Sequence, residues 1–428
     1  MNIHESEKIA GILEKEGYVV TDDSANADIV VFNTCCIRET AEQKIYGHLG
    51  LVKKQKEAKK DMVVVLCGCM TQQDGEAARI KAKFPQVDVV LGSANLDKLA
   101  QAVDFARRSK RKTFDVEMTT DGDEGIPQTR TSFPNAWVNI IYGCNNFCTY
   151  CIVPYVRGRE RSRNMSDILD EVRDLIAQGY KEITLLGQNV NSYGKDLDDG
   201  SSFATLLDEI GKMPGKFRLR FMTSHPKDLT DDVIRSIAKH DNICNCIHLP
   251  VQSGSNEVLR KMNRRYTREQ YLQLIEKIKA KLPNVGITTD IMVGFPGETD
   301  EDFEDTLDLI RRARYSSAFC FVFSRRKGTP AWSMENQVPA DVKRKRITAL
   351  LAEQNKITKE ISKEMQGQIC QILVEDVNAK YEDTYCGRTE NGRLVNFKSQ
   401  TNLVGEFVQV KIASSKSATL WGELVEEI

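Results

Sequence analysis

Three cysteines in the stretch Cys144-Asn-Asn-Phe-Cys148-Thr-Tyr-Cys151 are the residues best suited to metal chemistry. Cysteine thiolates hold iron–sulfur clusters, and a [4Fe–4S] cluster normally takes four of them. Three thiolates packed so closely leave one iron without a protein ligand, and an open metal position can bind and activate a small molecule. The C-x3-C-x2-C spacing therefore predicts a catalytic cluster held by Cys144, Cys148 and Cys151.

Zinc binding, a disulfide and chance are weaker interpretations of this spacing. A zinc site needs a fourth ligand nearby, usually within a second pair of ligands, and no histidine lies within forty residues on either side. A disulfide would leave one of the three cysteines over, and it does not suit an intracellular chain. Three buried cysteines that share this spacing by chance are the remaining alternative.

The composition of the whole chain is that of an ordinary globular protein, with 41% hydrophobic and 28% charged residues. Its 428 residues predict two or three domains. No apolar run has the length of a membrane span, no signal peptide opens the chain, and twelve cysteines without a secretory signal favour a reducing compartment. We expect a cytoplasmic protein without membrane contact. Its net charge is −1, so any RNA site must be a local basic patch.

Helix and strand signals alternate over residues 1–110 and predict a doubly wound parallel-sheet domain. Cys35 and Cys36 follow the first expected strand, and Cys67 and Cys69 follow the second. Because ligands of open α/β sheets bind outside the carboxyl ends of the strands, these cysteines are expected to converge on one site. The expected strands are 28–33, 62–66 and 87–91, with helices at 2–17 and 95–107.

Residues 111–133 carry few apolar side chains and are interpreted as a linker, and residues 134–366 then alternate strands and helices again. Six βα units predict an open, partial (β/α)6 barrel, whose active site lies at the C-terminal ends of its strands. Polar or glycine-rich loops follow these strands, although each alone is equally well explained as a turn. The residues of these loops that we expect to bind a cofactor are Gly187, Gln188, Ser224, Gln252 and Asp290. The expected strands are 137–141, 182–186, 218–222, 246–249, 286–291 and 318–323, and the expected helices are 167–178, 203–212, 231–239, 268–282 and 300–312.

The last part of the chain, residues 367–428, changes to an alternating apolar and polar pattern, after a charged helix in 336–366. Asn391-Gly392 is a typical hairpin turn. The pattern predicts a small antiparallel β-barrel, a kind of domain that often binds oligonucleotides. Its expected strands are 369–377, 394–398, 407–412 and 419–425.

Nearly the full chain resembles the radical S-adenosylmethionine (SAM) methylthiotransferases, and its terminal barrel resembles a TRAM domain. Two of its motifs, Asn33-Thr-Cys35-Cys-Ile-Arg38-Glu39 and the run from Arg157 to Arg163, are similar in form to those of the MiaB-type tRNA enzymes. The motifs are Asn33-Thr-Cys35-Cys-Ile-Arg38-Glu39, Gly68-Cys69-Met-Thr-Gln72, the three-cysteine loop, Val153-Pro-Tyr-Val-Arg157-Gly-Arg159-Glu-Arg161-Ser-Arg163, His248-Leu-Pro-Val-Gln-Ser-Gly254 and Asp290-Ile-Met-Val-Gly-Phe-Pro-Gly-Glu298.

The resemblance implies addition of a methylthio group to carbon 2 of N(6)-isopentenyladenosine beside the tRNA anticodon. SAM would chelate the open iron of the Cys144–Cys148–Cys151 cluster, and its reduction would give a 5′-deoxyadenosyl radical. A second SAM would methylate sulfur on an auxiliary [4Fe–4S] cluster, for which Cys35 and Cys69 match two ligands. The aryl C–H bond is too weak an acid for a side-chain base, which agrees with radical chemistry. The implied partners are a tRNA anticodon stem-loop and a small flavodoxin-like electron donor, and we expect a monomer.

The chain departs from the family at its first residues. In the family, a third auxiliary cysteine lies in a Cys-x-Met-Asn motif, whereas this sequence starts at the matching Met1-Asn2. Either the native protein begins further upstream, or Cys36 or Cys67 takes the place of the missing ligand. Adjacent residues of an extended chain point to opposite sides, so Cys36 is expected to be a buried core residue, as is Cys67. We therefore expect this chain to hold the radical cluster and to bind the auxiliary cluster poorly.

Basic residues suggest where RNA binds. Arg157, Arg159, Arg161 and Arg163 alternate, so an extended stretch would align them on one face, where arginine forks suit phosphates. A solvated charged loop is the alternative. In the terminal barrel, an RNA-binding face would need to combine Arg388, Arg393, Lys398 and Lys411.

Two alternative functions stay open from the sequence. One is methylthiolation of an aspartate in a ribosomal protein, which the Asn-Thr-Cys-x-Ile-Arg-Glu motif disfavours. The other is a non-catalytic RNA-binding iron–sulfur protein. Such a binder would release no 5′-deoxyadenosine after reduction with SAM.

Overall fold

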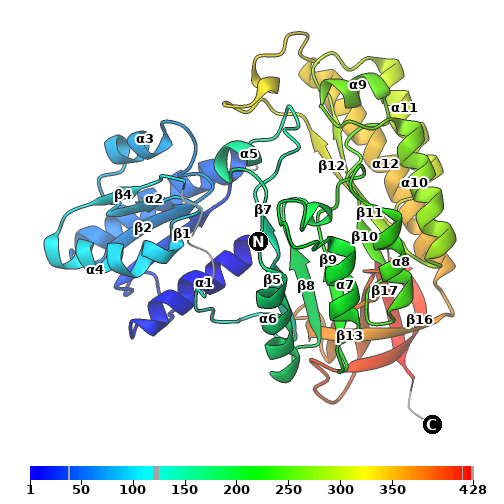
Figure 1. Cartoon of the computed structure of the whole chain (residues 1–428), viewed down its shortest axis with the longest axis horizontal. Coiled ribbons are helices and arrows are strands. Elements are labelled where there is room, and N and C mark those ends of the chain that lie inside the picture. The colour runs from blue at the N-terminus through cyan, green and yellow to red at the C-terminus, as the bar shows by residue number, and fades with distance from the viewer. Residues whose placement is uncertain (37–38, 119–124, 417, 426–428) are drawn as a thin grey trace. The chain divides into compact units, whose positions relative to one another are not determined.

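The computed structural model describes residues 1–36, 39–118, 125–416 and 418–425 (Figure 1). Ile37 and Arg38 of the first motif, and residues 119–124 of the expected linker, lie outside this description. The chain divides into two compact units. The first unit comprises Met1–Thr131, Gly143–Arg159 and Arg326–Trp332, and the second comprises Ser132–Tyr142, Glu160–Arg325 and Ser333–Ile428.

A four-stranded parallel sheet forms the centre of the first unit, in the order β1-β2-β3-β4. Side chains alternate across it: Val63 and Val65 pack with α1 and α4, whereas Val64 and Leu66 pack with α2 and α3. Helices therefore cover both faces, which confirms the predicted fold class (Figure 1). The elements are α1 (Asn2–Lys15), β1 (Ile29–Thr34), α2 (Glu39–Ala58), β2 (Val63–Gly68), α3 (Glu76–Lys83), β3 (Val89–Leu91), η1 (Leu96–Lys98), α4 (Leu99–Ser109) and β4 (Thr113–Asp115). Strand β4 occupies the start of the expected linker.

The second unit contains the predicted partial (β/α) barrel. Its six parallel strands form two sheets, β5-β8-β9 and β10-β11-β12, joined by a bridge between Leu219 and Ile243. Ile183, Leu185 and Ile247 pack into a core shared with the surrounding helices. The strands are β5 (Asn135–Asn139), β8 (Glu182–Leu186), β9 (Arg218–Phe221), β10 (Cys246–His248), β11 (Gly286–Val293) and β12 (Ser317–Val322). The helices are α6 (Met165–Ala177), α7 (Phe203–Gly211), α8 (Asp231–Lys239), α9 (Asn256–Lys261), α10 (Arg268–Lys281), α11 (Asp300–Ala313) and α12 (Ala340–Glu364).

A closed barrel of strands ends the second unit, in the order β13-β14-β15-β17-β16. The antiparallel prediction holds for every pairing except that of β15 with β17, which is parallel. The Asn391-Gly392 turn joins β14 to β15 as expected. The strands are β13 (Ile369–Val377), β14 (Thr384–Thr389), β15 (Leu394–Lys398), β16 (Phe407–Lys416) and β17 (Thr419–Leu424).

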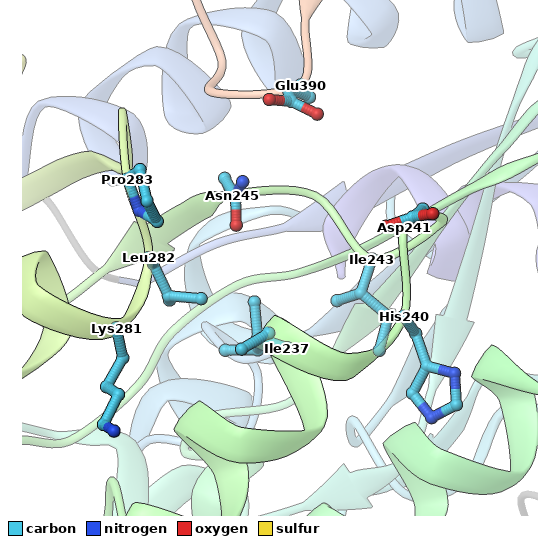
Figure 2. A pocket seen from close by; sticks show the side chains of 10 residues that line it. Ile237, His240, Asp241, Ile243, Asn245, Lys281, Leu282, Pro283 and Glu390 are labelled. Carbon is cyan, nitrogen blue, oxygen red and sulfur yellow. The ribbon is translucent and has the colours of Figure 1, made fainter.

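The hairpin between β14 and β15 docks against the N-terminal ends of the (β/α) barrel strands. Arg220 donates to the carbonyl oxygens of Thr389 and Glu390 at 2.7 and 3.0 Å. A Cβ on Gly286 would lie 2.1 Å from the carbonyl oxygen of Asn391, so the backbones touch there. Figure 2 shows a cavity at this end, where Glu390 of the hairpin faces Asn245 and Asp241. It lies at the opposite end of the strands from the predicted cofactor-binding loops.

No helix among the described residues combines the length and the apolar character needed to cross a membrane.

Candidate functional site

The three-cysteine loop lies in the first unit and is closed at its base by backbone contacts. The N–H of Cys144 donates to the carbonyl oxygen of Gly158 at 3.2 Å. Gly143 has a positive φ of 73°, and a Cβ there would lie only 1.9 Å from the carbonyl oxygen of Arg159. The loop then runs into the short helix α5 (Val153–Val156). Only glycine fits at 143, because both the backbone conformation and the close approach exclude a side chain.

The cysteine side chains of this loop differ in exposure. Cys148 is buried, and Cys144 and Cys151 are half-buried. Asn146 donates from Nδ2 to the Cys144 sulfur at 3.4 Å, and the Cys151 N–H donates to the Cys148 carbonyl oxygen at 2.9 Å. The donor set is three sulfurs on one short loop, and this chemistry fits an iron–sulfur cluster. Within the described ranges, no three His, Cys, Asp or Glu side chains are already gathered around an ion position, so the ligand assignment depends on the spacing.

A second group of cysteines lies at the carboxyl edge of the β1–β2 pair. Thr34 and Gly68 are register partners, and the Cys69 N–H donates to the Thr34 carbonyl oxygen at 3.0 Å. Cys35 and Cys69 are the next residues on these two strands, and neighbouring strands are about 4.8 Å apart. A Cβ on Gly68 would lie 2.5 Å from the Thr34 oxygen, and its φ is 99°. The structure thus brings together the two sheet-edge loops that the sequence predicted to converge.

Cys36 and Cys67 are both buried, as expected, but their thiols have different partners. Cys67 is fully buried, its thiol donates to the Phe32 carbonyl oxygen at 3.7 Å, and burial raises its pKa. The Cys36 thiol instead hydrogen-bonds to Cys69, and this hydrogen bond raises the pKa of Cys36. The expected burial of Cys36 is confirmed, and the residue also lies beside Cys69, because β1 ends at Thr34 and strand alternation stops there.

The surroundings of Cys69 favour its thiolate form. The hydrogen bond from Cys36 is the main cause that lowers the pKa of Cys69 to about 7; burial opposes it, and the positive charge of Arg157 adds to it. Arg157 donates from Nε to the Cys69 sulfur at 3.0 Å. Because the thiolate is the form that binds metals, this environment favours Cys69 as a ligand.

Each of the four alternating arginines has a carboxylate or an aromatic ring beside it. Arg157 pairs with Glu5 at 2.6 Å, and Arg163 pairs with Glu171 at 2.7 Å. Arg159 stacks on the Phe147 ring at 4.4 Å and is exposed, and Arg161 lies over the Tyr142 ring at 5.3 Å. The strand that contains Arg161 is only two residues long, β7 (Arg161–Ser162), so the extended stretch that the prediction assumed does not span the four arginines.

The basic face expected on the terminal barrel is also incomplete. Arg393 is buried and donates to the Ser316 carbonyl oxygen at 2.9 Å and to Ser362. Arg388 lies beside Glu375 at 3.6 Å, whereas Lys398 and Lys411 are exposed. Arg393 therefore holds the barrel to the rest of the second unit and cannot belong to an RNA-binding face.

The predicted cofactor loops lie in the second unit, at the C-terminal ends of its strands. The Gln252 N–H donates to the Asp290 carbonyl oxygen at 2.9 Å, and the Ser224 N–H donates to that of His248 at 3.2 Å. Asp290 Oδ2 lies 3.6 Å from His248 Nε2. Gly187 is packed against Ile141, whose Cγ2 would lie 2.4 Å from an added Cβ, and Gln188 beside it is half-buried.

Some buried polar atoms at these strand ends have no hydrogen-bond partner among the residues that the structure describes. Ser224 Oγ and Asn191 Nδ2 are two of them. A buried polar group without a partner is costly, so these atoms fit a site for a polar ligand. Asn191 was not among the predicted residues, although its position shortly after Gly187 and Gln188 could have indicated it.

Three family models match the chain. The Radical SAM superfamily matches residues 138–310, the TRAM domain matches 363–425, and residues 1–92 match a family described as "Uncharacterized protein family UPF0004".

Curated relatives match over almost the whole length. A protein of Clostridium botulinum (strain Langeland) named tRNA-2-methylthio-N(6)-dimethylallyladenosine synthase is 51% identical to this chain. The match covers 99% of this chain and 94% of the relative. The relative of the same name in Acetivibrio thermocellus is 50% identical over 99% of this chain and 89% of its own length.

Solved structures share the fold at low identity. The radical SAM methyltransferase TsrM from Kitasatospora setae has a TM-score of 0.57 at 16% identity, covering 77% of this chain and 74% of that one. The cobalamin-dependent radical enzyme OxsB has a TM-score of 0.55 at 13% identity, covering 82% and 53%. With half of its residues identical to full-length relatives, and with the cysteine loop in place, the chain belongs to the radical SAM methylthiotransferase family.

Proposed function

We propose that this protein adds a methylthio group to carbon 2 of N(6)-dimethylallyladenosine, the isopentenyladenosine next to the tRNA anticodon. The observation that carries the proposal is the 51% identity over nearly the full chain to enzymes named for this reaction, together with both cysteine sites. The Clostridium and Acetivibrio relatives are named as tRNA enzymes, so a ribosomal protein substrate is not favoured.

The residues divide into three groups with different tasks. Cys144, Cys148 and Cys151 hold a [4Fe–4S] cluster whose open iron takes SAM. Cys35 and Cys69 supply two of the ligands of an auxiliary cluster. When bound, these groups and SAM supply the radical and the methylthio group that side chains lack. The polar loops of the second unit bind and orient SAM through Gly187, Gln188, Asn191, Ser224, Gln252 and Asp290.

Residues outside these three groups contact the RNA. Arg159 and Arg161 expose part of their side chains, and arginine forks bind phosphates. The TRAM barrel supplies Lys398 and Lys411 on its surface. The partner is a tRNA anticodon stem-loop, and the reaction takes place in the cytoplasm. An unpaired base of the anticodon loop can leave its stack and enter the enzyme. A small flavodoxin-like protein donates electrons to the enzyme, which acts as a monomer.

The test is a reaction of the anaerobically reconstituted chain with SAM, a reductant and tRNA that carries dimethylallyladenosine. Nucleoside mass spectrometry is expected to find the 2-methylthio product, and chromatography to find 5′-deoxyadenosine. Substrate tRNA that lacks the dimethylallyl group is the control. Release of 5′-deoxyadenosine without any thiolated nucleoside, from a chain that holds both clusters, would contradict the proposal.

A further inference from the structure

Arg157 is the member of the arginine run that contacts a cysteine sulfur in the structure as described. It follows α5 in the first unit, and its side chain is only 11% exposed. Its Nε donates to the Cys69 sulfur at 3.0 Å. A phosphate cannot reach a side chain in this position, so the RNA-binding role expected for Arg157 does not suit its environment.

Glu5 on α1 fixes the other end of this guanidinium. The distance from Arg157 Nη1 to Glu5 Oε1 is 2.6 Å, and the carboxylate is 7% exposed. The guanidinium thus has a carboxylate partner and a sulfur partner, and an arginine side chain stays charged in proteins. A planar fork held at two points has little freedom to rotate, and its Nε–H therefore stays directed at the sulfur.

The contact joins two segments that the proposed chemistry requires. Arg157 follows α5 after the loop that carries Cys144, Cys148 and Cys151, whereas Cys69 directly follows β2 of the parallel sheet. Ile152 and Val156 of the same loop lie in one apolar cluster with Cys36, Cys69 and Met70. The Arg157–Cys69 hydrogen bond thus has both this apolar cluster and Glu5 as neighbours, and a charge-assisted hydrogen bond is strong at such a buried position.

We propose that Arg157 is a positioning residue for the auxiliary cluster: it donates a hydrogen bond to the ligand sulfur of Cys69 and raises the reduction potential of the cluster bound there. The inference rests on the proposed auxiliary cluster. Hydrogen bonds to cluster sulfurs and nearby positive charge favour the reduced cluster, which carries one more negative charge.

The experiment uses the full chain with Cys144, Cys148 and Cys151 replaced by alanine, so that only the auxiliary cluster can form. After anaerobic reconstitution, iron is counted and the cluster is titrated with a reductant while electron paramagnetic resonance follows the reduced form. Arg157→Met is compared with Arg163→Met. Arg163 is the matched control, since it is also 11% exposed and also pairs with a glutamate, but its Nη1 donates to Glu171 and the Asn139 carbonyl oxygen in the second unit.

Arg157→Met is expected to lower the ratio of reduced to oxidised cluster about tenfold at a fixed potential, which corresponds to about 59 mV for a one-electron couple. Arg157→Lys, which keeps the charge and loses the fork, is expected to recover part of this shift. Arg163→Met is expected to leave the potential unchanged. Loss of iron in Arg157→Met alone, with the same melting temperature as Arg163→Met, would also support the proposal.

Two results would overturn the inference while leaving the auxiliary cluster in place. One is an unchanged potential in Arg157→Met, and the other is an equal shift or an equal iron loss in Arg163→Met, which would indicate a general effect of losing a buried ion pair. A parent chain that binds no iron at all would instead overturn the proposed auxiliary cluster, and the inference would fall with it.

Discussion

The two cysteine sites of this protein are built in opposite ways. The Cys144, Cys148 and Cys151 site is local, since one loop closed by Gly143 supplies every thiol. The site at Cys35 and Cys69 is assembled from two strands, and the register of β1 and β2 brings its residues together. A local site can be identified from spacing alone, whereas a site made by strand register needs the topology of the sheet.

The largest expected effect separates the two sites by chemistry. Replacing Cys144, Cys148 and Cys151 with alanine should abolish 5′-deoxyadenosine release and remove about four irons per chain. Cys69→Ala should abolish methylthio transfer while 5′-deoxyadenosine release continues. Iron analysis and chromatography of the reaction products check both. If Cys69→Ala also stopped 5′-deoxyadenosine release, the two sites would not be separable in this way.

A pair of glycine variants should break one site each through the backbone. Gly143→Ala places a Cβ 1.9 Å from a carbonyl oxygen and should disrupt the loop, and Gly68→Ala meets Thr34 at 2.5 Å and should disrupt the strand edge. Both glycines have positive φ, so the strain adds about 1–3 kcal/mol in each case. The iron content of Gly143→Ala is measured in a chain that lacks Cys35 and Cys69. That of Gly68→Ala is measured in a chain that lacks Cys144, Cys148 and Cys151. Gly75→Ala, at an open position with a similar φ, is the control.

Cys36→Ala and Cys67→Ala sharpen the description of the register-built site. Cys36 contacts Cys69, so its loss should lower auxiliary iron and raise the pKa of the Cys69 thiol from about 7. Cys67 lies in the core, so its loss should leave iron unchanged and cost about 1–2 kcal/mol of unfolding free energy. Thiol alkylation rates against pH and chemical denaturation distinguish the two. Equal iron in both variants would mean that the contact of Cys36 with Cys69 does not support the auxiliary site.

The smallest effect concerns the strand-end loops of the second unit, which are also built from separate strands. Burial, and the nearby charge of Arg264, lower the pKa of His225 to about 2. The folded state therefore binds fewer protons than the unfolded state below the ordinary histidine pKa, and stability should fall as the pH drops below about 6.5. His225→Gln should flatten this dependence between about pH 6.5 and 5 in denaturant titrations. An unchanged slope would assign it to other groups.

The sequence was sufficient for the fold because periodicity is a local signal. β8 and α8 have the expected bounds, and the alternating pattern located four strands of the terminal barrel. β14 was missed because Cys386 and Gly387 interrupt the alternation, and β4 because three residues are too few to show a period. Both are recognised only when neighbouring strands are present to pair with them.

The site was less predictable wherever partners are distant in the chain. No pattern near Arg157 indicates that Glu5 and Cys69 will enclose it. The environment of Cys36 depends on where β1 ends, a boundary that propensity does not define. By contrast, the clustering of Ser224, Gln252 and Asp290 could be predicted because the C-terminal ends of successive parallel strands meet at one end of the barrel.

The joint between the (β/α) barrel and the terminal barrel has an evolutionary consequence. Arg218 and Arg220 bind the hairpin strands through the main-chain oxygens of Arg388, Thr389 and Glu390. Main-chain acceptors are the same whatever side chain they carry. Substitutions at Arg388 and Glu390 therefore leave these acceptors in place, so the two arginines of β9 keep the module attached while those side chains vary. Thr389 is more constrained, because it is buried and its hydroxyl accepts from the Arg393 N–H at 2.9 Å.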